Sequence, residues 1–181
     1  MLGMKNIEET PFDDYNHFFT GNVDGESIEK TIRWLLTAGR NPPSKTDHLR
    51  MYINSDGGNL TDAFALIDIM RTFPLPIATF GMGNLMSSAF MIFAAGTKGH
   101  RAIGRNTSIM IHQFNHEYAG KYHDMKAYAE EIDRINYRMV AELARTGKLT
   151  EQEVGTKLLK PSDVWLSAEQ LVELGFADII F

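Results

Sequence analysis

The sequence contains no cysteine, which removes several kinds of chemistry at once. Without cysteine there is no disulfide, no thiolate-bound metal and no cysteine nucleophile. Long apolar runs are also missing, since the longest one, residues 89–95, is far shorter than the roughly 20 residues a membrane helix needs. Basic residues are not in excess: 18 lysines and arginines stand against 23 acidic residues, a net charge of −5. These absences argue against a membrane protein and against a nucleic-acid-binding protein, which would carry a basic patch.

What is present is typical of a globular protein. Of the 181 residues, 44% are hydrophobic and 23% are charged. A chain of this length can bury roughly 70% of its unfolded surface, so we expect a single domain over residues 1–181. The first residues show no basic segment followed by an apolar stretch, which predicts no signal peptide. We therefore expect a soluble, cytoplasmic protein.

Strand-like and helix-like segments alternate along the chain, and no repeat or linker interrupts them. The strand-like runs are residues 17–21, 49–54, 77–82, 107–111 and 177–181. The helical segments begin at Ser27, Thr61, Ser87, Tyr122 and Ser167, with glycine stop signals at Gly39, Gly147 and Gly175. Residues 40–48 are predicted to form a loop and residues 55–58 a sharp turn. This alternation predicts an α/β protein with a largely parallel sheet covered by helices.

Two of the helical segments have a clear apolar face. Ser27 is expected to cap the first, whose apolar residues are Ile28, Ile32, Leu35 and Leu36. Residues 122–145 keep apolar side chains at steps of three and four, namely Met125, Tyr128, Ile132, Ile135, Met139 and Leu143. The second pattern predicts one long amphipathic helix.

Ser87 is the residue with the most chemical promise. It follows a strand-like run and a glycine-containing turn, and it begins a short apolar helical segment. A serine held at a helix N-terminus lies among free backbone N–H groups and at the positive end of the helix dipole, which favour developing negative charge. Acyl-transfer enzymes place a nucleophile in this way. Taken alone, a serine at a helix start is far more often a simple helix N-cap.

Other candidate groups fall at the ends of predicted strands, where open α/β sheets place their sites. Gly57-Gly58 could leave N–H groups unobstructed for an oxyanion hole, or could form an ordinary tight turn. His112 could act as a general base, or could be a hydrogen-bonded structural histidine. Asp163 could orient a histidine, or could be a solvated residue or cap. None of these residues decides the function by itself.

Together these segments resemble the ClpP serine peptidases, the proteolytic subunits of the Clp protease. The resemblance covers residues 18–180 in the family's order and spacing. The matching segments are FTGNV at 19–23, YINSDGG at 52–58, GNLMSSAF at 83–90, AGTKGHR at 95–101, MIHQ at 110–113, DVWLSA at 163–168 and GFAD at 175–178. The implied fold is a ClpP/crotonase-like α/β fold of repeated β-β-α/β-α units, with a protruding handle over about residues 113–147.

The resemblance implies roles for individual residues. Ser87 matches the nucleophile, His112 the general base and Asp163 the carboxylate that orients the imidazole. The N–H groups of Gly58 and Ser88 match the oxyanion hole. The family's substrate-binding positions fall on Gly57, Asn59, Leu60, Phe114, Asn115 and His116. The chain order Ser…His…Asp differs from the Ser…Asp…His order of α/β-hydrolases.

The resemblance also implies an assembly. ClpP-like subunits form two stacked seven-membered rings, and an AAA+ unfoldase feeds unfolded polypeptides into the enclosed chamber. The helix at 122–145 would interlock the rings. The chain itself would need no cofactor and no metal, since ATP would be used by the unfoldase.

Several positions depart from the family pattern. Asp56 stands where proline usually precedes the paired glycines, and Ala89 replaces a glycine. Residues 114–117, Phe-Asn-His-Glu, replace a proline and a glycine pair that pass beside the substrate backbone. Only about seventeen residues precede Phe18, so we expect docking to an unfoldase or pore gating to be altered or lost.

Three other interpretations remain open. The chain could be a weakly active or inactive subunit in a mixed ring. It could be a crotonase-fold enzyme acting on acyl-CoA thioesters, although that class does not need the Ser87, His112 and Asp163 set. A metal site formed by His112, His116 and Glu117 is the third, although their order is not His-Glu-x-x-His.

Overall fold

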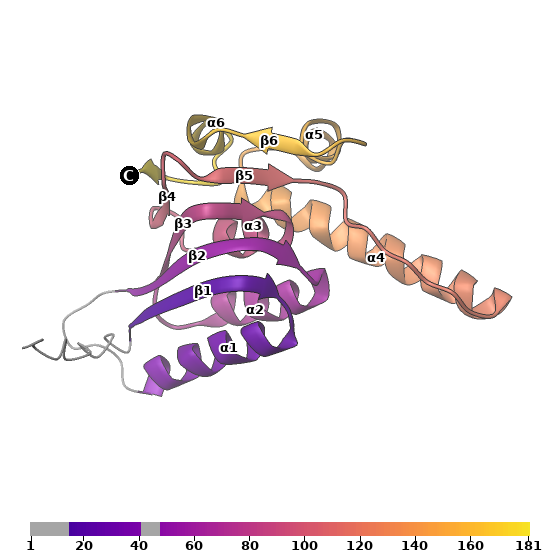
Figure 1. Cartoon of the computed structure of the whole chain (residues 1–181), viewed down its shortest axis with the longest axis horizontal. Helices are drawn as coiled ribbons and strands as arrows, with labels where there is room; N and C mark the ends of the chain where they lie inside the picture. Colours follow the sequence, from indigo (N-terminus) through magenta and orange to yellow (C-terminus); the bar gives the residue numbers. More distant parts are fainter. Residues whose placement is uncertain (1–14, 41–47) are drawn as a thin grey trace, which may run out of the picture.

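The computed structural model describes residues 15–40 and 48–181, and its centre is a seven-stranded sheet (Figure 1). The main path runs β1 (Asn16–Val23), β2 (Leu49–Gly58), β3 (Ile77–Met86), β4 (Arg101–Ile103) and β7 (Ile179–Ile180), all paired in parallel. Strand β5 (Ser108–Ile111) also pairs in parallel with β3, beyond the end of β4. Strand β6 (Val164–Leu166) adds to β5 in the antiparallel direction. The predicted α/β class with a largely parallel sheet is confirmed.

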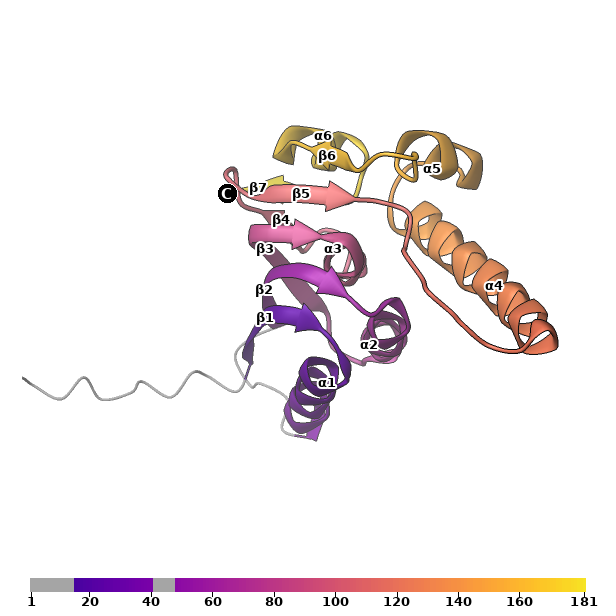
Figure 2. The same cartoon turned by 45° about the vertical axis from the view of Figure 1, so that its right-hand side comes forward.

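Three helices cover one face of the sheet, as Figure 2 shows. They are α1 (Gly25–Arg40), α2 (Leu60–Thr72) and α3 (Ser87–Ala94). The last two short helices, α5 (Glu151–Lys157) and α6 (Ala168–Glu173), lie with β6 at the β5 edge (Figure 1). Helix α3 is buried from Ser88 to its end, because its apolar residues surround the whole helix and it packs between sheet and helices.

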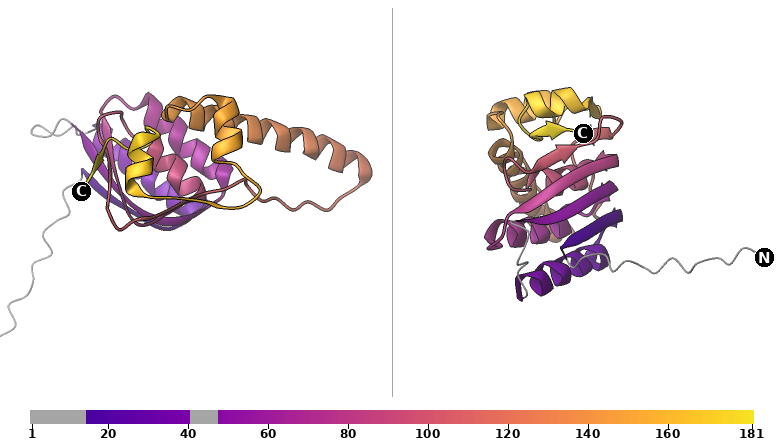
Figure 3. Two further views of the ribbon diagram at one scale, coloured as in Figure 1. Left: turned by 90° about the horizontal axis from the view of Figure 1, so that it is seen from above. Right: turned by 90° about the vertical axis from the view of Figure 1, so that its left-hand side faces the viewer.

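Helix α4 (Tyr122–Thr146) projects far beyond the other elements, most clearly when seen from above (Figure 3, left). Its C-terminal part is anchored in the core through Met139 and Leu143, whereas Tyr122 and Met125 are 66% and 49% exposed. Gly147 follows as its C-cap. The long helix predicted over residues 122–145 is confirmed, although only part of its apolar face is covered within the subunit.

The structure corrects several local predictions. Residues 55–58 continue β2 and do not form a turn after it. Ser27 lies inside α1, and the preceding Asp24 accepts the Ser27 N–H at 2.9 Å. Leu36 is 51% exposed and does not share the buried face of Leu35.

Strands β4 and β6 and helix α5 were not predicted as separate elements. Elements of three to seven residues carry too little periodicity to be recognised, and sheet pairing defines the strands. Most of the predicted loop at 40–48 lies outside the described residues. Within residues 15–40 and 48–181, no helix has both the length and the apolar character needed to cross a membrane.

Candidate active site

Ser87 occupies a strained position at the junction of β3 and α3. Its φ is +54°, and it is the only residue other than glycine with a positive φ among residues 15–40 and 48–181. The left-handed region is unfavourable for residues with a Cβ, and such strain clusters at functional sites. The helix N-cap is Met86, which makes no side-chain capping hydrogen bond. Ser87 is therefore the first helical residue, and the N-cap interpretation is wrong.

His112 is brought to Ser87 by the pairing of two strands. Met86 at the end of β3 pairs with Met110 in β5, so the residues that follow these strands emerge side by side. His112 Nε2 lies 2.9 Å from Ser87 Oγ, which is a hydrogen-bond distance. This is the contact that transfer of the hydroxyl proton to an imidazole requires.

Ser88, the neighbouring hydroxyl, lies in a different environment. It is 2% exposed, and its Oγ has no hydrogen-bond partner within the described part of the chain. Its N–H belongs to the first turn of α3, where backbone donors have no partner inside the helix. The side chain is thus enclosed and hydrogen-bonded to no base in the described residues, and its backbone N–H lies in the first turn of the helix.

Gly57 allows the end of β2 to approach Ser87, and Gly58 allows it to approach Val23 in β1. Their φ values are +94° and +151°, which a residue with a side chain adopts only under strain. A Cβ on Gly57 would lie 2.8 Å from Ser87 Cβ, and one on Gly58 would lie 2.3 Å from the Val23 carbonyl oxygen. The two glycines are therefore a packing requirement of the site, whatever their N–H groups bind.

Asp163 adjoins the strand that pairs with the strand before His112, but it makes no hydrogen bond or ion pair with that histidine. Strand β6 pairs with β5 through Val164 and Ile111, so the next pair in the same register would be Asp163 and His112. Asp163 is exposed, and in the described residues it makes no hydrogen bond or ion pair with His112. The strand register brings the two residues to the same end of the sheet, while the orienting contact is not formed.

A cleft of about 590 Å³ opens beside Ser87 and His112. Five of the six positions matched to substrate binding line it: Asn59, Leu60, Phe114, Asn115 and His116. Gly57, the sixth, is buried beneath Ser87. The other lining residues are Asp56, Gly58, Thr61, Tyr128, Glu131 and Ile135, three of them from α4.

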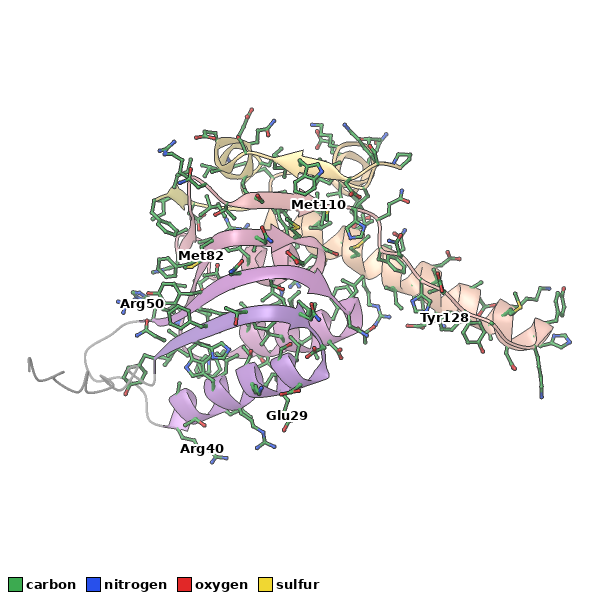
Figure 4. All side chains as sticks on the ribbon, in the orientation of Figure 1. Glu29, Arg40, Arg50, Met82, Met110 and Tyr128 are labelled. Carbon is green, nitrogen blue, oxygen red and sulfur yellow. The ribbon has the colours of Figure 1, made fainter. Side chains whose placement is uncertain are left out.

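Residues 113–121 run out beside α4 (Figures 1 and 2), and three residues of this segment, Phe114, Asn115 and His116, line the cleft. Tyr128, labelled on α4 in Figure 4, hydrogen-bonds His116 Nε2 and stacks on Tyr118 with ring centroids 4.1 Å apart. These contacts tie the extended segment to the helix. Helix α4 therefore lies beside the cleft as well as in the core.

The metal alternative finds no support in this arrangement. In residues 15–40 and 48–181, no group of three or more His, Asp or Glu side chains could hold a metal ion. His116 is bound to Tyr128, and His112 faces Ser87.

Comparison with known proteins decides the family. The family model described as Clp protease matches residues 5–181. The chain belongs to the Clp protease family.

Individual Clp protease relatives agree over most of their length. The chain is 33% identical over 164 residues to ATP-dependent Clp protease proteolytic subunit 1 of Corynebacterium jeikeium, covering 89% of this chain and 84% of that protein. It is also 33% identical over 172 residues to proteolytic subunit 2 of the same organism and to proteolytic subunit 1 of Corynebacterium diphtheriae. Each of these alignments covers 94% of this chain and 80% of the relative. The acyl-CoA alternative receives no support from these relatives.

Some residues of this Clp protease cleft were missed by sequence reasoning. Tyr128 and Ile135 belong to the apolar face of the long helix and were interpreted only as packing residues. Thr61 was identified only as the start of a helical segment, and Glu131 was not singled out. Helical periodicity indicates that one face of α4 is apolar. It could not show whether that face packs in the core or lines the cleft, because the cleft also depends on the path of residues 113–121.

Proposed function

We propose that this Clp protease family member is an active serine endopeptidase subunit that cleaves unfolded polypeptides. The observation that carries the proposal is the 2.9 Å contact between Ser87 Oγ and His112 Nε2, with Ser87 held at a positive φ at the start of a buried helix. A residue in this strained conformation presents its side chain outward from the strand–helix junction.

The chemistry follows from these positions. Ser87 Oγ attacks the peptide carbonyl carbon while His112 Nε2 takes the hydroxyl proton. The N–H groups of Gly58 and Ser88 would stabilise the negative oxygen of the tetrahedral intermediate. His112 then gives its proton to the leaving amine, and water releases the acyl group from Ser87 by the reverse sequence. No cofactor is required.

Asp163 is proposed to hold His112 in the correct tautomer and to stabilise the imidazolium. The support is the β5–β6 register, whose last pair, Ile111 and Val164, directly adjoins His112 and Asp163.

We propose that the subunit works in two stacked seven-membered rings and receives substrate from an ATP-dependent AAA+ unfoldase. The named relatives are proteolytic subunits of ATP-dependent Clp proteases. Tyr122 and Met125 at the outer end of α4, and Tyr118 in the segment before it, are exposed apolar residues. Apolar surface on a projecting helix is suited to contact with another subunit.

A catalytically weak subunit in a mixed ring is the second candidate. It is favoured by one observation, the absence of a contact between Asp163 and His112 in the described part of the chain.

Hydrolysis of a short fluorogenic peptide by purified protein distinguishes these candidates. We expect hydrolysis and fluorophosphonate labelling by the unmodified protein, loss of both in Ser87→Ala, and labelling retained in Ser88→Ala. Equal hydrolysis by the unmodified protein and Ser87→Ala would favour the structural subunit. Labelling that survives in Ser87→Ala but not in Ser88→Ala would identify Ser88, and not Ser87, as the nucleophile.

A further inference from the structure

The fixed charges that line the cleft beside Ser87 are all negative. Two carboxylates, Asp56 and Glu131, line it, together with two histidines, and none of its lining residues is lysine or arginine. A substrate entering this cleft therefore meets negative charge and no fixed positive charge.

The two carboxylates are not equivalent. Glu131 forms ion pairs with Arg134 at 2.7 Å and Arg138 at 2.6 Å, so its charge is balanced on α4 itself. The hydrogen bond from Arg134 lowers the pKa of Glu131, with the charges of both arginines acting in the same direction. Asp56 has no ion pair in residues 15–40 and 48–181. Asp56 thus carries the unbalanced charge of the cleft.

A polar network holds Asp56 in place. Asn84 Nδ2 donates a hydrogen bond to Asp56 Oδ1 at 2.7 Å, and the Asn84 N–H donates to Asn54 Oδ1 at 2.9 Å. Gly83 makes this possible, because a Cβ at that position would lie 2.6 Å from Asn54 Oδ1. Neutral amide groups orient the carboxylate, so its negative charge is not neutralised by these contacts.

The position of Asp56 relates it directly to the chemistry. It is two residues before Gly58, whose N–H we assign to the oxyanion, and it lines the same cleft as Ser87. A carboxylate here opposes the negative charge that develops on the carbonyl oxygen. A cation on the substrate would offset this opposition and would be attracted by the same carboxylate.

We propose that Asp56 makes the cleft selective for peptides with a lysine or arginine beside the scissile bond. This rests on the proposed peptidase function and names its substrate class. Asp56 acts as a specificity determinant. Its negative charge disfavours the reaction of neutral peptides, whereas the positive charge of a cationic peptide neutralises it. Because the pair is solvent-exposed, we expect a preference of roughly fivefold, near the upper value for exposed ion pairs.

The test uses internally quenched peptides that differ at one position. Lysine, norleucine or glutamate is placed in turn at each of the three positions on either side of the cleaved bond. We expect kcat/KM to follow the order lysine, norleucine, glutamate at the position nearest Asp56, and the preference to weaken with added salt. In Asp56→Asn the norleucine peptide should be cleaved faster than by the unmodified protein, and the lysine preference should disappear. Asp56→Lys should favour glutamate.

Asp68→Asn is the matched control, since it removes an exposed carboxylate on α2 that does not line the cleft. It should leave the order unchanged. A lysine preference that survives in Asp56→Asn, or that is absent from the unmodified protein, would overturn the proposal.

A second arm separates selectivity from activity. The lysine and norleucine peptides, fluorescently labelled, are titrated by anisotropy against Ser87→Ala protein with and without Asp56→Asn. Tighter binding of the lysine peptide that depends on Asp56 supports the proposal, and equal binding contradicts it. Hydrolysis unaffected by Ser87→Ala would instead show that the proposed function has failed.

Discussion

Helices α3 and α4 form two sides of the candidate site, and they are held in very different ways. Helix α3 is enclosed between the sheet and the other helices, and its N-terminus carries Ser87 in a backbone conformation that only dense packing can maintain. Helix α4 is anchored only at its C-terminal end, yet it supplies Tyr128, Glu131 and Ile135 to the cleft. The hydrogen-bonded pair of Ser87 and His112 therefore lies in the enclosed part of the molecule, and the cleft residues of α4 lie in the exposed part. Changes to the first should abolish chemistry or folding, while changes to the second should alter selection and assembly.

The largest effect is expected for His112→Gln, in the enclosed part. If His112 is the general base, as proposed, its loss should lower kcat by roughly 10²–10⁴-fold. The thermal unfolding midpoint should change little, because His112 is only half-buried at a strand end. Peptide hydrolysis and differential scanning calorimetry measure the two quantities. A variant that keeps most of its activity would exclude His112 as the base.

Next in size is the effect of Arg101→Met on folding. The buried guanidinium bonds the carbonyl oxygens of Thr146 at 2.9 Å and Gly175 at 2.8 Å, and it pairs with Asp178 at 2.8 Å. It thereby ties the anchored end of α4 to the core. Removing it leaves buried acceptors and a charge without a partner, which costs about 3–5 kcal/mol in the free energy of unfolding. Denaturant titration of each variant measures this loss.

Arg105→Met provides the matched control, because Arg105 pairs with Glu169 on the surface. It should cost less than about 1 kcal/mol. Equal losses for the two arginine variants would contradict the proposed anchoring role of Arg101.

The same ion pair predicts a response to acid. Burial alone would raise the pKa of Asp178, but hydrogen bonds from Arg101 and its positive charge outweigh burial and lower that pKa. The carboxylate therefore stabilises the fold above its ordinary pKa of 3.8, and this contribution is lost as the pH falls below that value. Acid titration of the unmodified protein should show this loss of stability, and Arg101→Met should lack that component.

The smallest effect on subunit stability is expected at the outer end of α4. Tyr122→Ser combined with Met125→Ser should change the free energy of unfolding by no more than about 0.5 kcal/mol, since both side chains are exposed. If α4 joins two rings, sedimentation velocity should show a shift from double rings to smaller assemblies. An unchanged assembly would place the ring contacts elsewhere.

Sequence reasoning identified the sheet, the long helix and the residues Ser87, His112 and Asp163, but it described their surroundings unevenly. Residues 55–58 look like a turn because of their paired glycines, while pairing with Val23 and Leu85 keeps them in β2. Helical periodicity in α4 indicated an apolar face without indicating what covers it. Local sequence patterns indicate the secondary-structure propensity of a segment and which of its faces is apolar. Strand pairing and the walls of a cleft instead depend on contacts between segments that are distant in sequence.

The sequence by itself determined the family, the α/β class and the order of the candidate catalytic residues, because these are recorded in residue identity and spacing. Only the tertiary structure decided that Ser87 is strained and lies within hydrogen-bond distance of His112, that Ser88 is enclosed, and that Asp163 makes no hydrogen bond or ion pair with the histidine. It also decided that Asp56 is the unbalanced charge of the cleft, since Arg134 and Arg138 neutralise Glu131. Distances between atoms and the balance of charges arise from packing among segments far apart in the chain, and no local pattern encodes them.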